Sequence, residues 1–342
     1  MKRPKNLDEL PVEEQLAWYK SSFEELYQES ASRRFTPEVE RLFKDIYNII
    51  IDPNNFYYPK TKDKLIKDLE SLMGNKVAVI YNEGVTGKGR DFDVVLEQFA
   101  MGTGGYLSDW DREKDTDSTL IIRGIGGTSR EAIRYCWDTG RDYLTIDTGY
   151  LGNEQFKTKV FHRVTKNNLQ HLGPIIERPT DRLTALKYKF RKFRPGKKVL
   201  ICPPSEKVML LWDQPDPRTW TEQVIEQLKE YTDRPIEVRL KPNRTERTTS
   251  MRIQDALADD VHCLITYNSI AATEAILWGK PAIALGPNAA QVICNTKLED
   301  VENLHIPLEE EVVAFAAHLS YCQFSVTELK DGTAWRILNE GS

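Results

Sequence analysis

Apolar residues recur every three to four positions through the first part of the chain, up to about residue 73. In LPVEEQLAWYKSSFEELY they fall at Leu16, Tyr19 and Phe23, and PEVERLFKDIYNIII repeats the spacing. KTKDKLIKDLESLMGN continues the pattern and ends at Gly74, a residue type that commonly stops a helix. This spacing is typical of amphipathic helices. It predicts a helical extension over residues 1–75.

From Lys76 onward, short β-branched runs alternate with helical patterns. Such runs are KVAVIY, TLIIRGIGG and DYLTIDTGYLG, and after a pause at about 151–197 the alternation resumes with KKVLICPPS, RPIEVRLKP, CLITYN and PAIALG. Strands that alternate with helices form parallel sheets covered on both faces. We therefore predict an α/β protein with two doubly wound domains that face a cleft. The expected domains are 76–175 and 198–305, with a basic linker at 176–197 and C-terminal helices at 306–342 that pack across the lobes.

Composition excludes several classes of protein. The 342 residues are 40% hydrophobic and 10% aromatic, which is enough for two folded domains and too apolar for a disordered chain. No stretch reaches the roughly 18 apolar residues of a membrane helix, and the start has no apolar signal region. The five cysteines form no CxxC pair, which argues against a disulfide framework or a structural zinc site. We expect a cytoplasmic protein with no membrane partner and no obligatory metal.

The formal net charge of −5 hides one strongly basic segment. Residues 155–198 contain thirteen Lys and Arg against two acidic residues, so the segment carries +11 and the rest of the chain −16. Aromatic residues alternate with these cations. Two interpretations stay open: a site for a polyanion such as nucleic acid, bound by phosphate contacts and base stacking, or a solvated linker. The residues expected to contact nucleic acid are Lys88, Arg163, Lys166, Lys187, Lys189, Arg191 and Lys192.

Loops that follow parallel strands are where such sheets bind ligands. In CLITYNSIAATEA a strand runs into Asn268 and Ser269, either of which can cap the next helix and, with its amides, hold an anion. Glu274, further along that helix, can accept hydrogen bonds from a ribose diol. RPIEVRLKP places Arg239 and Lys241 on one face of a strand end, where they could hold a diphosphate. The ordinary alternatives are a capped helix with a solvated glutamate, and cations that protect an edge strand.

Two further loops contribute candidates. In EGVTGKG, Gly84 and Gly87 would let the backbone approach a ligand closely, but no Ser or Thr follows Lys88 as a P-loop requires. In DYLTIDTGYLG, Asp147 ends a strand and could take a proton from an acceptor hydroxyl. An aspartate that bonds its own turn is an equal alternative. His162 is a second candidate for the base.

Several of these motifs together resemble the GT-B glycosyltransferases. They are the Arg and Lys on a late strand and the element Asn-Ser-x-x-x-x-Glu followed by Gly-Lys-Pro-Ala. The resemblance implies two Rossmann-like domains, the second of which holds a nucleotide-sugar, with Ser269 at phosphate and Glu274 at ribose. DYLTIDTGYLG with FHRVTKNNLQ, VLICPPSEKV, and TDRPIEVRLKP with LITYNSIAATEA also resemble bacteriophage enzymes that glycosylate hydroxymethylated pyrimidines in DNA. The resemblance covers roughly residues 76–305.

The resemblance implies a glycosyltransferase that moves a sugar from a UDP-sugar to the hydroxyl of a hydroxymethylated base, such as hydroxymethylcytosine, in phage DNA. Asp147 or His162 would be the catalytic base, and no cofactor beyond the donor is required. The donor would be bound by Arg239, Lys241, Asn268, Ser269, Glu274, Ser205, Gly84 and Gly87. Two alternatives stay open: transfer to a cell-surface or capsular polymer, and a non-catalytic DNA- or nucleotide-binding protein on a degenerate GT-B fold. The N-terminal helices are candidates for a protein contact.

Overall fold

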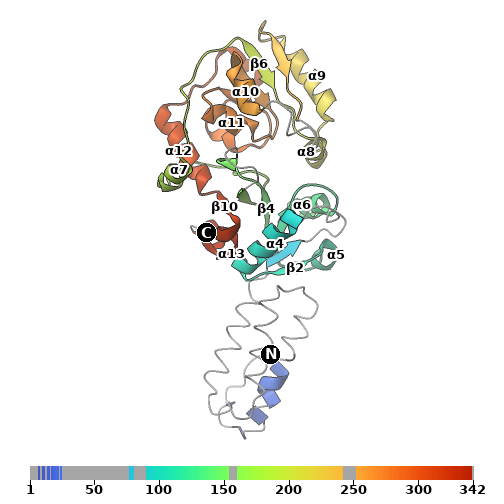
Figure 1. Ribbon diagram of the computed structural model, residues 1–342. Helices are drawn as coiled ribbons and strands as arrows, with labels where there is room; N and C mark the ends of the chain where they lie inside the picture. The colour runs from blue at the N-terminus through green and yellow to red at the C-terminus, as the bar shows by residue number, and fades with distance from the viewer. Residues whose placement is uncertain are drawn as a thin grey trace. The chain divides into compact units, whose positions relative to one another are not determined.

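The computed structural model forms two compact units (Figure 1). It describes residues 7, 10–11, 14–15, 17–22, 24, 77–80, 90–153, 160–241 and 252–340. The first unit contains Met1–Arg123, Asp138–Tyr143 and Val326–Ser342, and the second contains Gly124–Trp137 and Leu144–Ser325. Of the expected helical extension, residues 14–15, 17–22 and 24 are helical, and the rest lies outside the described residues. In the part of the chain that is described, no helix is long and apolar enough to cross a membrane.

In the first unit, β1 (Val77–Ile80) lies between two strands that run parallel to it. β1 pairs in parallel with β2 (Tyr106–Ser108) and with β3 (Thr119–Arg123). All four residues of β1 are buried, as expected of a parallel strand covered on both faces. Besides the helical residues near the N-terminus, the described helices of this unit are α4 (Arg90–Thr103), α5 (Trp110–Glu113), α13 (Val326–Lys330) and α14 (Thr333–Asn339).

The end of the chain packs onto α4, at a point where only glycine fits. A Cβ on Gly102 would lie 1.8 Å from the carbonyl oxygen of Leu329 in α13. The close backbone approach lets Leu329 and Ala334 bury completely beside Phe99 and Ala100.

The second unit contains a four-stranded parallel sheet in the order β7-β6-β8-β9. Its strands are β6 (Lys198–Ile201), β7 (Ile236–Val238), β8 (Val261–Thr266) and β9 (Ala282–Ala284). The helices that alternate with them are α8 (Glu206–Leu211), α9 (Pro217–Leu228), α10 (Ile253–Ala258) and α11 (Ala271–Leu277). The predicted α/β alternation with parallel strands is thereby confirmed for this sheet.

Each face of this sheet has its own apolar core. On one face, Val199 and Ile265 pack with Trp220 and Val224 of α9. On the other face, strand residues pack with α10 and α11, whose alanines are completely buried at Ala272 and Ala275. Successive side chains of a strand point to opposite faces, so the consecutive apolar residues Val199–Ile201 of β6 and Cys263–Ile265 of β8 supply both cores.

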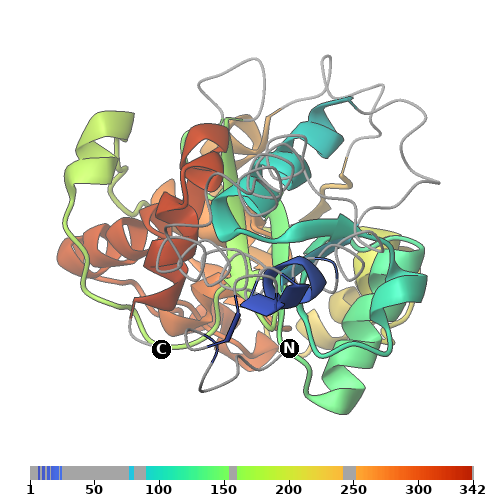
Figure 2. The same ribbon diagram turned by 90° about the horizontal axis from the view of Figure 1, so that it is seen from below.

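A second group of strands in this unit is antiparallel. β5 (Phe161–Lys166) lies between β4 (Tyr143–Thr148) and β10 (Gln323–Ser325), antiparallel to both. β10 follows α12 (Glu309–Ser320), which packs against α7 (Asp181–Leu186) (Figure 2). The short 3₁₀ helices of the unit are η5 (Ala289–Val292) and η6 (Leu298–Glu302), and α6 (Thr128–Thr139) belongs mostly to it.

The Gly-Lys-Pro-Ala element anchors the segment that precedes β6. Gly279 has φ +73°, and a Cβ there would lie 2.5 Å from the carbonyl oxygen of Lys192. The next residue, Lys280, is buried and donates from Nζ to the carbonyl oxygen of Arg194 at 3.2 Å. Burial lowers the pKa of Lys280. In the structure this element therefore holds the basic segment against α11.

Candidate functional site

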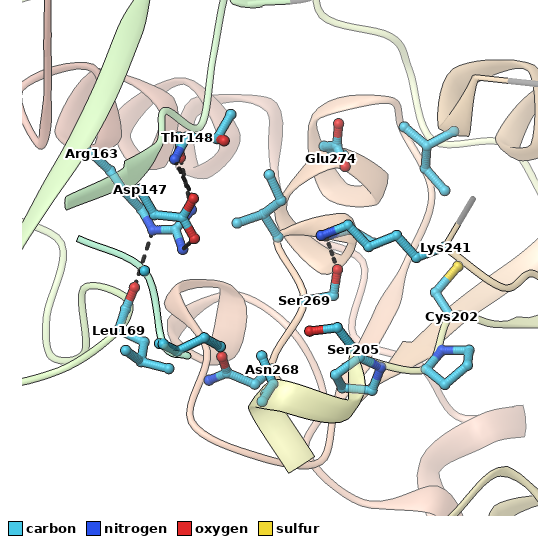
Figure 3. Close-up of a pocket in the computed structure, with 18 of the residues that line it drawn as sticks. Asp147, Thr148, Arg163, Leu169, Cys202, Ser205, Lys241, Asn268, Ser269 and Glu274 are labelled. Carbon is cyan, nitrogen blue, oxygen red and sulfur yellow. Dashed lines mark hydrogen bonds and ion pairs between the residues drawn. The ribbon is translucent and has the colours of Figure 1, made fainter. Parts of the chain in front are cut away.

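A pocket of about 340 Å³ opens inside the second unit, where three parallel strands end (Figure 3). β6 leads into Cys202 and Ser205, β7 into Arg239 and Lys241, and β8 into Asn268. This is the edge at which open parallel sheets bind ligands, and the volume is that of a site for a small molecule.

The corner between β8 and α11 is fixed by buried hydrogen bonds. Thr266 donates from Oγ1 to the carbonyl oxygen of Cys202 at 2.6 Å, which ties the ends of β8 and β6 together. Asn268 is buried, and its side-chain amide donates to the carbonyl oxygen of Pro287. Asn288 donates to the carbonyl oxygen of Ser269 at 2.8 Å. The loop is therefore rigid before any ligand arrives.

The structure refines the expected roles of Asn268 and Ser269. Helix α11 begins at Ala271 with Ile270 at the cap position, so neither residue is the cap. Ser269 accepts a hydrogen bond from the Ala271 amide at 3.3 Å and lines the pocket. Asn268 also lines it, but the bond of its side chain to Pro287 gives it a structural role in the loop.

Two cations and a carboxylate lie on this side of the pocket. Arg239 and Lys241 both line it, while Leu240 between them is 67% exposed. This is the alternation that places residues two apart on one face of an extended segment. The amino end of Lys241 points toward Ser269, and Glu274 lies in the first turn of α11 beside them (Figure 3).

Cys202 lies at the base of the pocket as a neutral thiol. Burial raises its pKa to about 12, although Arg239 beside it acts in the opposite direction. A thiolate is the reactive form of cysteine. Cys202 therefore contributes packing to the pocket rather than a nucleophile.

Asp147 and Arg163 form another wall of the pocket (Figure 3). They are directly opposite each other on β4 and β5, and a guanidinium nitrogen of Arg163 donates to Asp147 Oδ2 at 3.0 Å. The other carboxylate oxygen accepts from the Thr148 amide at 2.7 Å. The Arg163 side chain is 8% exposed and that of Asp147 is 57% exposed. The carboxylate is thus anchored by Arg163 and the Thr148 amide and is still exposed to the pocket.

A cluster of uncharged polar side chains lies behind Arg163. The Arg163 guanidinium lies 5.6 Å from the centre of the Tyr150 ring, and the Tyr150 hydroxyl accepts from the His171 amide at 3.0 Å. Burial raises the pKa of Tyr150. Burial, with smaller contributions from His318 and Arg163, lowers the pKa of His171 to about 3. Both groups are neutral near pH 7, so they offer Arg163 no counter-charge.

His162, the second candidate for the base, lies away from the pocket. It is adjacent to Arg163 on β5 and therefore points to the opposite face of the strand, where its register partners are Thr148 and Phe324. It is 3% exposed and does not line the pocket. The structure therefore leaves Asp147 as the candidate base.

Several of the expected nucleic-acid contacts have structural roles. Arg163 is buried in the bonds described above, and Arg191 lies over the ring of Trp278 at 3.8 Å. The aromatic residues of the segment, Tyr188, Phe190 and Phe193, pack against the core and are partly buried, so base stacking is not their evident use. The cations that remain exposed are Lys166, Lys187, Lys189, Arg191 and Lys192.

Of the remaining predicted residues, the structure describes only Ser205. Ser205 lines the pocket and begins α8 as its cap residue. Gly84, Gly87 and Lys88 lie outside the described residues. The pocket also includes Gly124, which has φ +79° and ends β3 in a turn, and Thr148. The glycine-rich run after β3 signalled the first of these, whereas nothing in the sequence marked the second.

Comparison with known proteins finds similarity among solved structures. No protein-family model matches the sequence, and no curated protein matches it significantly. Among solved structures, the chain is similar to KpsC, beta Kdo 2,4 transferase, from Thermosulfurimonas dismutans, with 15% sequence identity and a TM-score of 0.42. The match covers 72% of this chain and 90% of that one. A likeness at this identity and TM-score does not assign a function to the chain.

Proposed function

We propose that the protein is a glycosyltransferase that takes its sugar from a nucleoside-diphosphate sugar, with UDP as the nucleotide. One observation carries the proposal. A single pocket brings together Arg239 and Lys241 after a parallel strand, Glu274 in the first turn of α11, and the anchored carboxylate of Asp147 on another wall. Cations suited to a leaving diphosphate and a base suited to an acceptor hydroxyl are what such a transfer needs.

The donor would lie along the strand ends. Arg239 can bind a phosphate with two parallel hydrogen bonds, and Lys241 adds a second positive charge. Glu274 offers two acceptor oxygens to the hydroxyls of a ribose. Pro203 and Val208 line the same pocket with apolar surface that a base could cover.

The transfer requires one proton acceptor and a stabilised leaving group. Asp147 takes the proton of the acceptor hydroxyl while the oxygen of that hydroxyl forms a bond to the anomeric carbon of the sugar. The bond between that carbon and the diphosphate oxygen breaks, and its electron pair leaves with the diphosphate. Arg239 and Lys241 are already in place where this negative charge develops, which lowers the barrier because little reorganisation is needed.

For the acceptor we propose an acidic polymer, with hydroxymethylated DNA as the first candidate and an acidic surface polysaccharide as the second. The exposed cations before β6, among them Lys187, Lys189 and Lys192, support either. Reversing the charges of Lys189 and Lys192 should weaken binding of the true polymer and reduce its salt dependence. The matched control reverses the equally exposed Lys229 and Lys297. An equal loss in both double variants would remove the role of the basic segment.

The function is tested by incubating the protein with UDP-glucose, UDP-galactose and UDP-N-acetylglucosamine. One set of reactions contains hydroxymethylcytosine DNA, and another contains an acidic polysaccharide. Mass spectrometry should show one hexose, or one N-acetylhexosamine from UDP-N-acetylglucosamine, added per modified base or per polymer unit. Binding of UDP without any transfer would favour a non-catalytic nucleotide-binding protein. Failure to bind any nucleotide or nucleotide-sugar would refute the proposal.

A further inference from the structure

We propose that Arg163 is a positioning residue for Asp147: it holds the carboxylate in the orientation in which it receives the acceptor proton. This inference rests on the proposed function. It gives Arg163, which belongs to the basic segment, a role in the reaction that takes place in the pocket.

The first step of the argument is that Arg163 is held in place independently of Asp147. Its Nε donates to the carbonyl oxygen of Leu169 at 3.1 Å, and one terminal nitrogen donates to the carbonyl oxygen of Thr148 at 2.7 Å. Both acceptors belong to the backbone, and the side chain is only 8% exposed. The guanidinium plane is therefore fixed by the chain around it, and its other terminal nitrogen meets Asp147 at a defined place.

The second step is that the carboxylate is anchored at both oxygens and still accessible. Oδ2 accepts from Arg163 and Oδ1 from the Thr148 amide. Each carboxylate oxygen has two lone-pair positions, so such a group can accept several hydrogen bonds at once. Asp147 is 57% exposed and lines the pocket, which gives that hydroxyl access.

The third step concerns the charges around the pair. Tyr150 and His171 lie behind Arg163 and are neutral near pH 7, so Asp147 is the counter-charge that Arg163 has in this wall. Arg239 and Lys241 after β7, and Glu274 in the first turn of α11, also line the pocket. Arg163 is buried and Asp147 is exposed to the pocket. Their hydrogen bond can therefore hold the carboxylate in one orientation while it accepts a proton.

The test measures turnover and UDP affinity in Arg163→Lys and Arg163→Gln, with the three UDP-sugars as donors and hydroxymethylcytosine DNA as acceptor. A misplacement of about 1 Å can cost ~100-fold in rate. We expect kcat to fall about 100-fold in R163Q and about 10-fold in R163K, whose amine partly restores the contact. The KM for the donor and the Kd for UDP should stay within about twofold, because neither substitution touches the strand ends.

Arg182 provides a matched control because it is also a partly buried arginine held by the backbone. It donates to the carbonyl oxygens of Ser320 and Gln323 at 2.7 and 3.0 Å but does not line the pocket. Arg182→Lys should lose similar structural bonds and leave kcat unchanged within about twofold. A kcat loss in R182K equal to that in R163K would show a general effect on folding and overturn the inference.

A double-mutant cycle with Asp147→Asn separates positioning from an independent role. Residues that act as one unit give non-additive losses, so adding R163K to D147N should lower kcat by less than about threefold more. Losses that multiply, or full activity in both Arg163 variants, would overturn the inference while leaving the transferase intact. A wild-type protein that transfers no sugar would instead refute the proposed function, and the inference with it.

Discussion

The clearest test of the donor site is Arg239→Met, which removes the charge and leaves a shorter, unbranched apolar side chain. Arg239 is only partly exposed and lies beside Cys202 at the pocket base, so its bonds to a diphosphate would be partly shielded from water. A hydrogen bond to a charged group contributes about 1.5–3 kcal/mol. Partial exposure favours the lower half of that range, and ~1.5–2 kcal/mol corresponds to a loss of ~10–30-fold in affinity.

The assay compares UDP with uridine by isothermal titration calorimetry. Because the cation would contact phosphate alone, R239M should weaken UDP binding by that factor and leave uridine binding unchanged. The backbone amide of Arg239 bonds to the carbonyl oxygen of Ile201 at 2.8 Å, and the substitution keeps that bond. Lys229→Met, at the exposed residue that follows α9, controls for the lost charge. If R239M binds UDP as tightly as the wild type, or loses uridine equally, the diphosphate assignment fails.

The other predictions address the ribose contact, a buried histidine and a tight backbone approach. Glu274→Ala should weaken UDP and uridine alike, by about 10-fold in calorimetry, and selective loss of UDP alone would argue against a ribose contact. The pKa of His171 falls from 6.5 to about 3 on folding, so the unfolded state binds more protons between these values and stability decreases as the pH falls through this window. His171→Gln should flatten that decrease in thermal melts, and an unchanged pH profile would contradict the burial argument. Gly279→Ala should lower stability by ~2 kcal/mol or more in urea unfolding, because it adds a backbone clash to the left-handed strain. Gly140→Ala, with φ +71° and nothing within 4 Å, should show the strain alone, so equal effects would contradict the clash.

The alternation of strands and helices could be predicted because its physical cause is local. The run VAVI of β1 is apolar throughout, and VHCLIT of β8 is apolar or β-branched apart from His262. The strand β10, with only three residues, has no such signal. It pairs with β5 because the chain returns after α12, and that return is a tertiary event that a local pattern does not encode.

The candidate site shows the same division. Arg239 and Lys241 were predictable together because two-residue alternation holds in any extended segment. His162 and its neighbour Arg163 point to opposite faces of β5, and the pairing of β5 with β4 places Asp147 opposite Arg163. The preference for Asp147 over His162 therefore depends on strand pairing, which a local sequence pattern does not encode. From the sequence alone, Arg163 is expected among the exposed cations, because the net charge of a segment does not show which of its residues are buried. Its backbone acceptors, at Thr148 and Leu169, are set only by the fold.

The pairing of β10 with β5 has a consequence for how the protein is made. Gln323 on β10 accepts a hydrogen bond from the amide of Leu151 and donates to its carbonyl oxygen, across 172 positions of sequence. The wall that carries Asp147 is therefore completed by a segment that leaves the ribosome well after β4 and β5. A growing polypeptide would have the strand ends of the pocket before it could assemble the sheet that carries Asp147.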